Sequence, residues 1–147
     1  MNDKELQEQR KWYELIDHTA DTGFSVRGQT LEQLHEHSAF ALFDIMADLR
    51  NVTQKESRNI EVKAKDREAL LVDWLSELNY LFFTEGLISC NFEVAEIRDD
   101  YIRARIKGER YNPSVHIIRT EIKAVTYHGI YIHQRDGKWE AQVILDL

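Results

Sequence analysis

Two stretches of the chain concentrate side chains that could bind a metal ion. The segment Asp17-His18-Thr19-Ala20-Asp21-Thr22-Gly23 carries two carboxylates, one imidazole and two hydroxyls where the backbone is expected to turn. At the other end of the sequence, Asp146 lies beside Leu147, whose α-carboxylate is a further anionic group. Carboxylate oxygens are the ligands that hard divalent cations prefer in proteins. Both stretches are therefore candidate parts of a cation site.

Each stretch also has a purely structural interpretation. Short polar side chains in turns usually bind their own backbone, and a terminal Asp is usually solvated because chain ends are poorly ordered. If Asp146 and Leu147 lay against Asp21, however, three carboxylates would converge, and such a cluster requires a cation. The residues alone leave this choice open.

Several other reactive side chains have weaker support. His35-Glu36-His37 resembles a metal motif, but helical positions i and i+2 point apart, so we expect surface residues. Cys90 follows apolar residues and is expected to be a small buried hydrophobe. His128 could orient a ligand or cap a turn. Phe40 and Phe43 lie off the main apolar stripe of their segment, which favours a second packing surface over a partner contact.

Composition excludes several classes of protein. Hydrophobic residues make up 43% of the chain and charged residues 31%, which is typical of soluble globular proteins. No apolar run approaches the roughly 20 residues that span a bilayer, so we expect no membrane insertion. The net charge of −7 disfavours direct nucleic-acid binding, because phosphate backbones are bound mainly by cations.

The single cysteine excludes an intramolecular disulfide and a zinc site of several thiolates. We therefore expect a cytoplasmic protein.

Motif content argues against an autonomous enzyme, because the sequence has no glycine-rich phosphate loop, serine elbow or zinc signature.

The pattern of elements predicts one α+β domain over residues 1–147, with two main helices packed on an antiparallel or mixed β-sheet. The first helix is expected over residues 31–49, with Thr30 and Gln33 as a capping box. The second is expected between an Asp66 cap and Gly86. Residues 1–11 contain one apolar side chain, Leu6, and are expected to form a flexible lead-in.

The remaining segments read as strands. Period-two patterning and turn residues predict a hairpin over Asp99-Asp100 and another over Asp136-Gly137, a dipeptide that tolerates positive φ. The other strands are expected at residues 12–16, 24–27 and 59–64. Because the strands follow one another without regular βαβ alternation, the pattern favours α+β over α/β.

Four blocks of this sequence together resemble the archease family. They are Asp17 to Gly23, Ala41-Leu42-Phe43-Asp44-Ile45-Met46, Ile122-Lys123-Ala124-Val125-Thr126-Tyr127-His128, and the closing Asp146-Leu147. The resemblance extends from about Trp12 to the last residue. Four blocks in order over one chain are far more specific than any single block.

The resemblance implies a small α+β accessory protein of the RtcB-type RNA-splicing ligase. Such a protein promotes guanylylation and turnover of the ligase in tRNA ligation, can broaden its nucleotide use, and is not itself the catalyst. In the family a divalent cation, described as calcium, is held at positions matching Asp21, Asp146 and Leu147. Magnesium or manganese remain possible occupants.

Two alternatives from other classes stay open. One is a metal-dependent hydrolase of a small phosphorylated substrate, with His18 or His128 as the base. The other is a metal-binding chaperone module without specificity for the ligase.

Overall fold

The computed structural model describes residues 1–17 and 22–147. Its helices and strands follow this order along the chain: α1 (Asp3–Gln9), the short 3-10 helix η1 (Arg10–Trp12), β1 (Tyr13–Asp17), β2 (Thr22–Gly28), α2 (Leu31–Met46), the 3-10 helix η2 (Leu49–Asn51), β3 (Glu56–Lys63), α3 (Arg67–Glu85), β4 (Leu87–Arg98), β5 (Tyr101–Arg110), β6 (Ala124–Arg135) and β7 (Lys138–Asp146). The predicted α+β class is confirmed.

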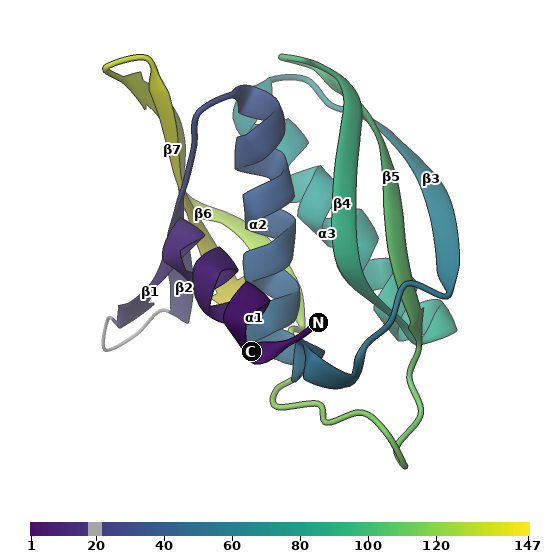
Figure 1. Ribbon diagram of the computed structural model, residues 1–147. Coiled ribbons are helices and arrows are strands. Elements are labelled where there is room, and N and C mark those ends of the chain that lie inside the picture. The colour runs from purple at the N-terminus through teal and green to yellow at the C-terminus, as the bar shows by residue number, and fades with distance from the viewer. Residues whose placement is uncertain (18–21) are drawn as a thin grey trace.

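The strands form two separate antiparallel sheets. One has the order β1-β2-β7-β6 and the other the order β3-β5-β4. Figure 1 shows α2 and α3 between the two sheets, so the molecule has three layers. The expected packing of two main helices on antiparallel or mixed β-sheet is therefore confirmed, and the strands are divided between two antiparallel sheets.

The reason for two sheets is that α2 is apolar on two sides. Phe40 and Phe43 are both buried. Phe40 meets the rings of Trp12 and Tyr13 on the side of the four-stranded sheet, whereas Phe43 stacks on Phe92 of β4 in the other sheet. The second packing surface predicted for these two residues is confirmed.

Helix ends follow the local signals that predict them. Thr30 Oγ1 accepts the Gln33 amide at 3.1 Å, and the Asp66 carboxylate accepts the Ala69 amide at 2.8 Å. Gly86 ends α3 with a φ of 71°, a left-handed conformation that glycine adopts without steric cost.

The helix α2 ends at Met46, three residues before the predicted end. The Met46 carbonyl accepts the amides of Arg119 and Thr120, and Ala47 forms an isolated bridge with Ile118. Backbone amides of a distant loop therefore donate to the carbonyl of Met46, the last residue of the helix. Helical periodicity in the sequence carries no information about such a contact.

Both predicted hairpins are present. Strands β4 and β5 pair across Asp99 and Asp100. Strands β6 and β7 pair across Asp136 and Gly137, whose φ angles are 54° and 76°. Two successive positive φ angles are the requirement of a type I′ turn.

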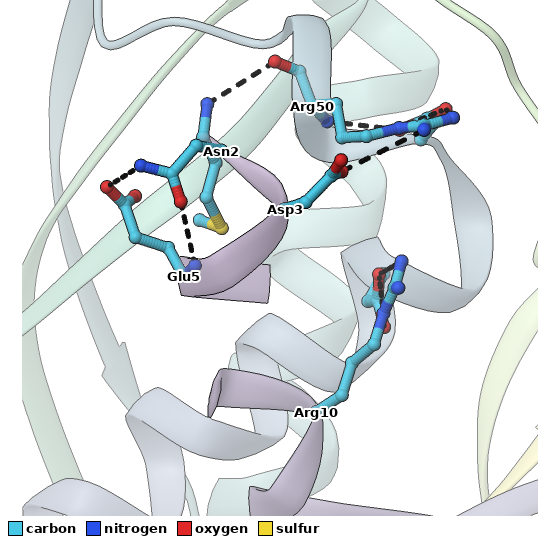
Figure 2. A network of polar contacts seen from close by, with 8 residues as sticks. Asn2, Asp3, Glu5, Arg10 and Arg50 are labelled. Carbon is cyan, nitrogen blue, oxygen red and sulfur yellow. Dashed lines mark hydrogen bonds and ion pairs between the residues drawn. The ribbon is translucent and has the colours of Figure 1, made fainter. Parts of the chain in front are cut away.

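The N-terminal segment differs from the expected flexible lead-in. Residues 3–9 are helical, and Leu6 is 1% exposed within the core. Figure 2 shows how polar contacts fix this segment: Asn2 caps the helix by accepting the Glu5 amide at 2.8 Å, and Asp3 lies 3.8 Å from Arg50. A buried leucine, a helix cap and polar contacts to Arg50 therefore hold this short helix against the domain.

Among the described residues, no helix combines the length and apolar character needed to cross a bilayer.

Candidate functional site

The candidate cation ligands at the C-terminus lie where β7 ends beside the start of β2. Thr22 of β2 pairs with Leu145 of β7. On the other side of β7, Asp146 pairs with Ala124, and its carbonyl accepts the Lys123 amide at 2.8 Å. The backbone of Asp146 is thus held from β6, so this chain end belongs to the sheet.

A glycine keeps the two strands close at this point. A Cβ built on Gly23 would lie 2.2 Å from the Val143 carbonyl oxygen, a distance at which the backbone would have to move. The absence of a side chain therefore permits the close approach of β2 and β7 next to the Thr22–Leu145 pair. This gives Gly23, the last residue of the first sequence block, a structural role.

Asp146 and Leu147 fit the cation proposal as far as they are described. The Asp146 side chain is exposed, Leu147 is 40% exposed, and their carboxylates are hard oxygen donors. Asp21 and His18 lie outside the described residues. Within residues 1–17 and 22–147, no cluster of three His, Cys, Asp or Glu side chains is placed to bind a metal.

The His35-Glu36-His37 segment is not the exposed surface that we expected. His35 is completely buried and its Nδ1–H donates to the Leu31 carbonyl at 2.9 Å, while its Nε2 is buried without a partner among the described residues. His37 stacks on Trp12, and Glu36 accepts the Val94 amide at 2.9 Å. His35 thus faces the core and Glu36 and His37 are partly buried, because α2 is covered on two sides.

Burial lowers the pKa of His35 to about 4, which predicts acid sensitivity. The unfolded chain, with an ordinary pKa of 6.5, takes up a proton first as pH falls, so the folded state loses stability from pH 6.5 towards pH 4. We expect a loss of about 2 kcal/mol between roughly pH 7 and pH 5 from this group. Urea unfolding of wild type and His35→Phe at both pH values measures it.

The His35→Phe variant should show a flatter stability profile over that pH range. His133→Phe provides the control for an exposed histidine, which lies 3.2 Å from the partly exposed Glu140, and it should change the profile far less than His35→Phe does. Equal pH dependence in wild type and His35→Phe would contradict the assignment to His35.

Two further candidates are located by the fold. Cys90 is buried, as predicted, and burial raises the pKa of its thiol to about 11, so a thiolate nucleophile is not available near neutral pH. His128 is exposed in β6, where the register with β7 shifts between Thr126 and Tyr131.

Sequence reasoning missed the buried carboxylate of Asp44, which lies in the second of the four family blocks, Ala41 to Met46. Asp44 is 2% exposed, and its oxygens accept bonds from Arg10 Nε at 3.0 Å, Arg10 Nη2 at 3.0 Å and the Tyr13 hydroxyl at 2.5 Å. Figure 2 shows the Arg10 side chain, which extends from η1. Burial, followed by the bond to Asp44, raises the pKa of Tyr13. The available signal was an acid within the otherwise apolar run Ala41 to Met46.

The chain matches the sequence model described as the Archease protein family (MTH1598/TM1083) over residues 13–147. It is 41% identical over 143 residues to the protein archease of Methanosarcina mazei, covering 95% of this chain and 98% of that relative. It is 39% identical over 142 residues to the protein archease of Pyrococcus furiosus, covering 94% and 99%.

Solved structures show the same relationship. The solution structure of protein 1598 from Methanobacterium thermoautotrophicum has a TM-score of 0.80 and 40% identity, with 93% of this chain and 99% of that chain covered. An archease from Thermotoga maritima, titled a possible chaperone, has a TM-score of 0.55 and 18% identity over 90% and 94% of the two chains. The second match supports the fold alone.

Proposed function

Because the chain belongs to the archease family, we propose that it is a non-catalytic accessory protein that activates an RtcB-type RNA-splicing ligase in tRNA splicing. Its role is to promote guanylylation and turnover of the ligase and to broaden its nucleotide use. The observation that carries this proposal is the family match over residues 13–147, which includes all four blocks.

The proposed cation ligands are Asp21, Asp146 and Leu147, with calcium as the first choice and magnesium or manganese as alternatives. Asp146 and Leu147 follow Leu145, the pairing partner of Thr22, and Asp21 immediately precedes Thr22 in the sequence. A bound divalent cation would supply positive charge that can polarise a phosphate oxygen. Of the chain's own groups, the Asp146 backbone is fixed by Ala124 and Lys123 while its carboxylate stays exposed.

The net charge of the chain also supports an RNA-binding ligase as its partner. The chain carries a net charge of −7, whereas a ligase surface that binds RNA must be basic. Opposite net charges speed the encounter of two proteins and favour one orientation over others. A cytoplasmic setting is part of this proposal, consistent with a lone buried thiol at Cys90.

The test is guanylylation of the cognate ligase under limiting divalent cation. We expect this chain to increase both the rate and the extent of covalent guanylate formation on the ligase, because it would supply a cation-bearing surface to the ligase. The measurement follows labelled guanylate on the ligase by gel, with and without stoichiometric chain.

The purified chain alone, incubated with nucleotide and with phosphoester substrates, is the control and should show no turnover. Hydrolysis by the chain without ligase would favour a hydrolase instead. Unchanged ligase guanylylation at every cation concentration would contradict the activator proposal.

A further inference from the structure

A cleft lies at the end of the four-stranded sheet opposite to Asp146 and Leu147. Its volume is about 600 Å³, within the range of about 300–1,000 Å³ typical of ligand sites. Its lining comes from both the tip of the β6–β7 hairpin and the start of α2; in Figure 1 these two segments are at the upper left and the top. We call it the Trp12–Trp139 cleft; its cationic and indole lining comprises Lys11, Trp12, Arg27, Arg135, Lys138 and Trp139.

The lining of this cleft has more cationic than anionic side chains, whereas the chain as a whole is acidic. Four cationic side chains line it, against the two carboxylates of Asp136 and Glu140, in a chain whose net charge is −7. Glu140 is also 3.2 Å from His133. Burial lowers the pKa of His37, another lining residue, so it adds no charge near neutral pH. Cations therefore outnumber carboxylates in the lining itself, although Glu8 and Glu14 outside it pair with Lys11 and Arg27.

Arg135 and Lys138 form the least compensated pair of cations in the cleft. They are direct cross-strand partners at the end of the β6–β7 hairpin, and like charges directly opposite each other destabilise a hairpin. Within residues 1–17 and 22–147, neither has an ion pair or a side-chain hydrogen bond. By contrast, Lys11 lies 3.2 Å from Glu8 and Arg27 lies 3.7 Å from Glu14. An anion between Arg135 and Lys138 would relieve their repulsion.

The two indoles of the cleft are fixed by neighbouring side chains. The Trp12 ring stacks on His37, with ring centroids 3.8 Å apart and planes 13° apart. The Arg67 guanidinium lies 4.8 Å from the centroid of the Trp139 ring. Rings that are already ordered lose little conformational entropy when a planar ligand stacks on them.

We propose that the Trp12–Trp139 cleft binds a nucleotide unit, with the base against an indole and the phosphate between Arg135 and Lys138. Paired cations beside ordered aromatic rings are the combination that binds single-stranded nucleic acids. A free nucleotide and a nucleotide within a single strand present the same chemistry. This assignment does not depend on ligase activation, since the cleft and the proposed cation ligands lie at opposite ends of β7.

The test uses two probes at roughly 50 mM salt, where electrostatic contacts are strong. One is a fluorescein-labelled oligouridylate of about ten nucleotides, followed by anisotropy, and the other is adenosine monophosphate as a competitor. We expect the wild-type chain to bind, and Arg135→Ala combined with Lys138→Ala to weaken binding by at least about tenfold. The slope of log affinity against log salt should fall by about 0.7 in that variant, because one phosphate contact on a single strand contributes about 0.7.

Matched variants distinguish binding in the cleft from nonspecific attraction of RNA to exposed cations elsewhere on the chain. Arg103→Ala combined with Arg105→Ala removes two exposed cations from β5 in the other sheet and should leave affinity within about twofold, as expected for cations that contact no phosphate. Trp139→Leu should weaken binding by about tenfold through lost stacking, with circular dichroism verifying the fold.

Displacement of the RNA by adenosine monophosphate assigns the cleft to free nucleotides, and failure of displacement assigns it to a strand. Either result supports the proposal. It is overturned if neither probe binds, if both charge-removal pairs weaken binding equally, or if a polyglutamate peptide competes as well as RNA and Trp139→Leu has no effect. The last outcome would assign the cleft to an acidic protein segment.

Discussion

A short neutral extension after Leu147 should abolish stimulation of the ligase and weaken cation binding at least about tenfold, because affinity for hard cations depends on the number of charged ligands. The extension converts the α-carboxylate into an amide and adds bulk beside Asp146. Asp146→Asn and Asp21→Ala should act in the same direction by removing side-chain carboxylates. Calcium titration by calorimetry and the guanylylation assay measure the two effects.

The fold should survive these changes. The Asp146 backbone is held by Ala124 and Lys123, and Leu147 is 40% exposed, so an extension can continue into solvent. The same extension before Met1 and the substitution Asp100→Asn, in the exposed turn between β4 and β5, serve as controls and should leave both measurements unchanged. A C-terminally extended chain with normal cation affinity and normal stimulation would exclude the Leu147 carboxylate as a required ligand.

Elements with strong local signals could be predicted from the sequence. The cap of Asp66, the left-handed Gly86 and the turn at Asp136-Gly137 act over a few residues, so their patterns are visible without the fold. The short helix α1 had a local signal too, since Asn2 and Glu5 bond to each other in both directions. It was missed because Leu6 is the only apolar residue that the helix contributes to the core.

Features that depend on distant contacts could not be predicted from patterns. Two sheets enclose α2, and this explains why His35 is buried although the segment looks polar. Likewise, nothing local places Leu145 opposite Thr22, because the two residues are near opposite ends of the sequence. The link between the first block and the closing carboxylates therefore rests on family resemblance and stays a prediction; the pairing of β2 with β7 places Thr22, the first described residue after Asp21, opposite Leu145.

The two ends of β7 differ in chemistry. Exposed carboxylates end the strand at Asp146 and Leu147, whereas Arg135 and Lys138 flank the turn at which it begins. The proposed cation ligands and the proposed nucleotide cleft therefore lie at separate ends of one strand. The two proposals can be tested on one protein with separate variants.

The contacts of the buried Asp44 carboxylate should contribute more to the free energy of unfolding than any of the other ion pairs described above. Asp44→Ala leaves the half-buried Tyr13 hydroxyl and the Arg10 guanidinium without their shared acceptor. Breaking a buried charge pair costs about 3–5 kcal/mol. Because the Arg10 side chain is 41% exposed and is partly resolvated, we expect the low end, about 3 kcal/mol. Chemical denaturation at neutral pH measures this loss.

A second Tyr–Asp pair in the same molecule provides the control. Tyr127 donates to Asp73 at 2.7 Å, but this contact is exposed, so Asp73→Ala should cost less than about 1 kcal/mol. Asp44→Asn, which keeps one acceptor and removes the charge, should fall between the two. A double-mutant cycle of Asp44→Ala with Tyr13→Phe isolates the hydroxyl's share. If Asp44→Ala and Asp73→Ala lower the free energy of unfolding equally, burial is not what makes the Asp44 contacts important, and the carboxylate in the second block must have a role other than fixing η1 and β1 to α2.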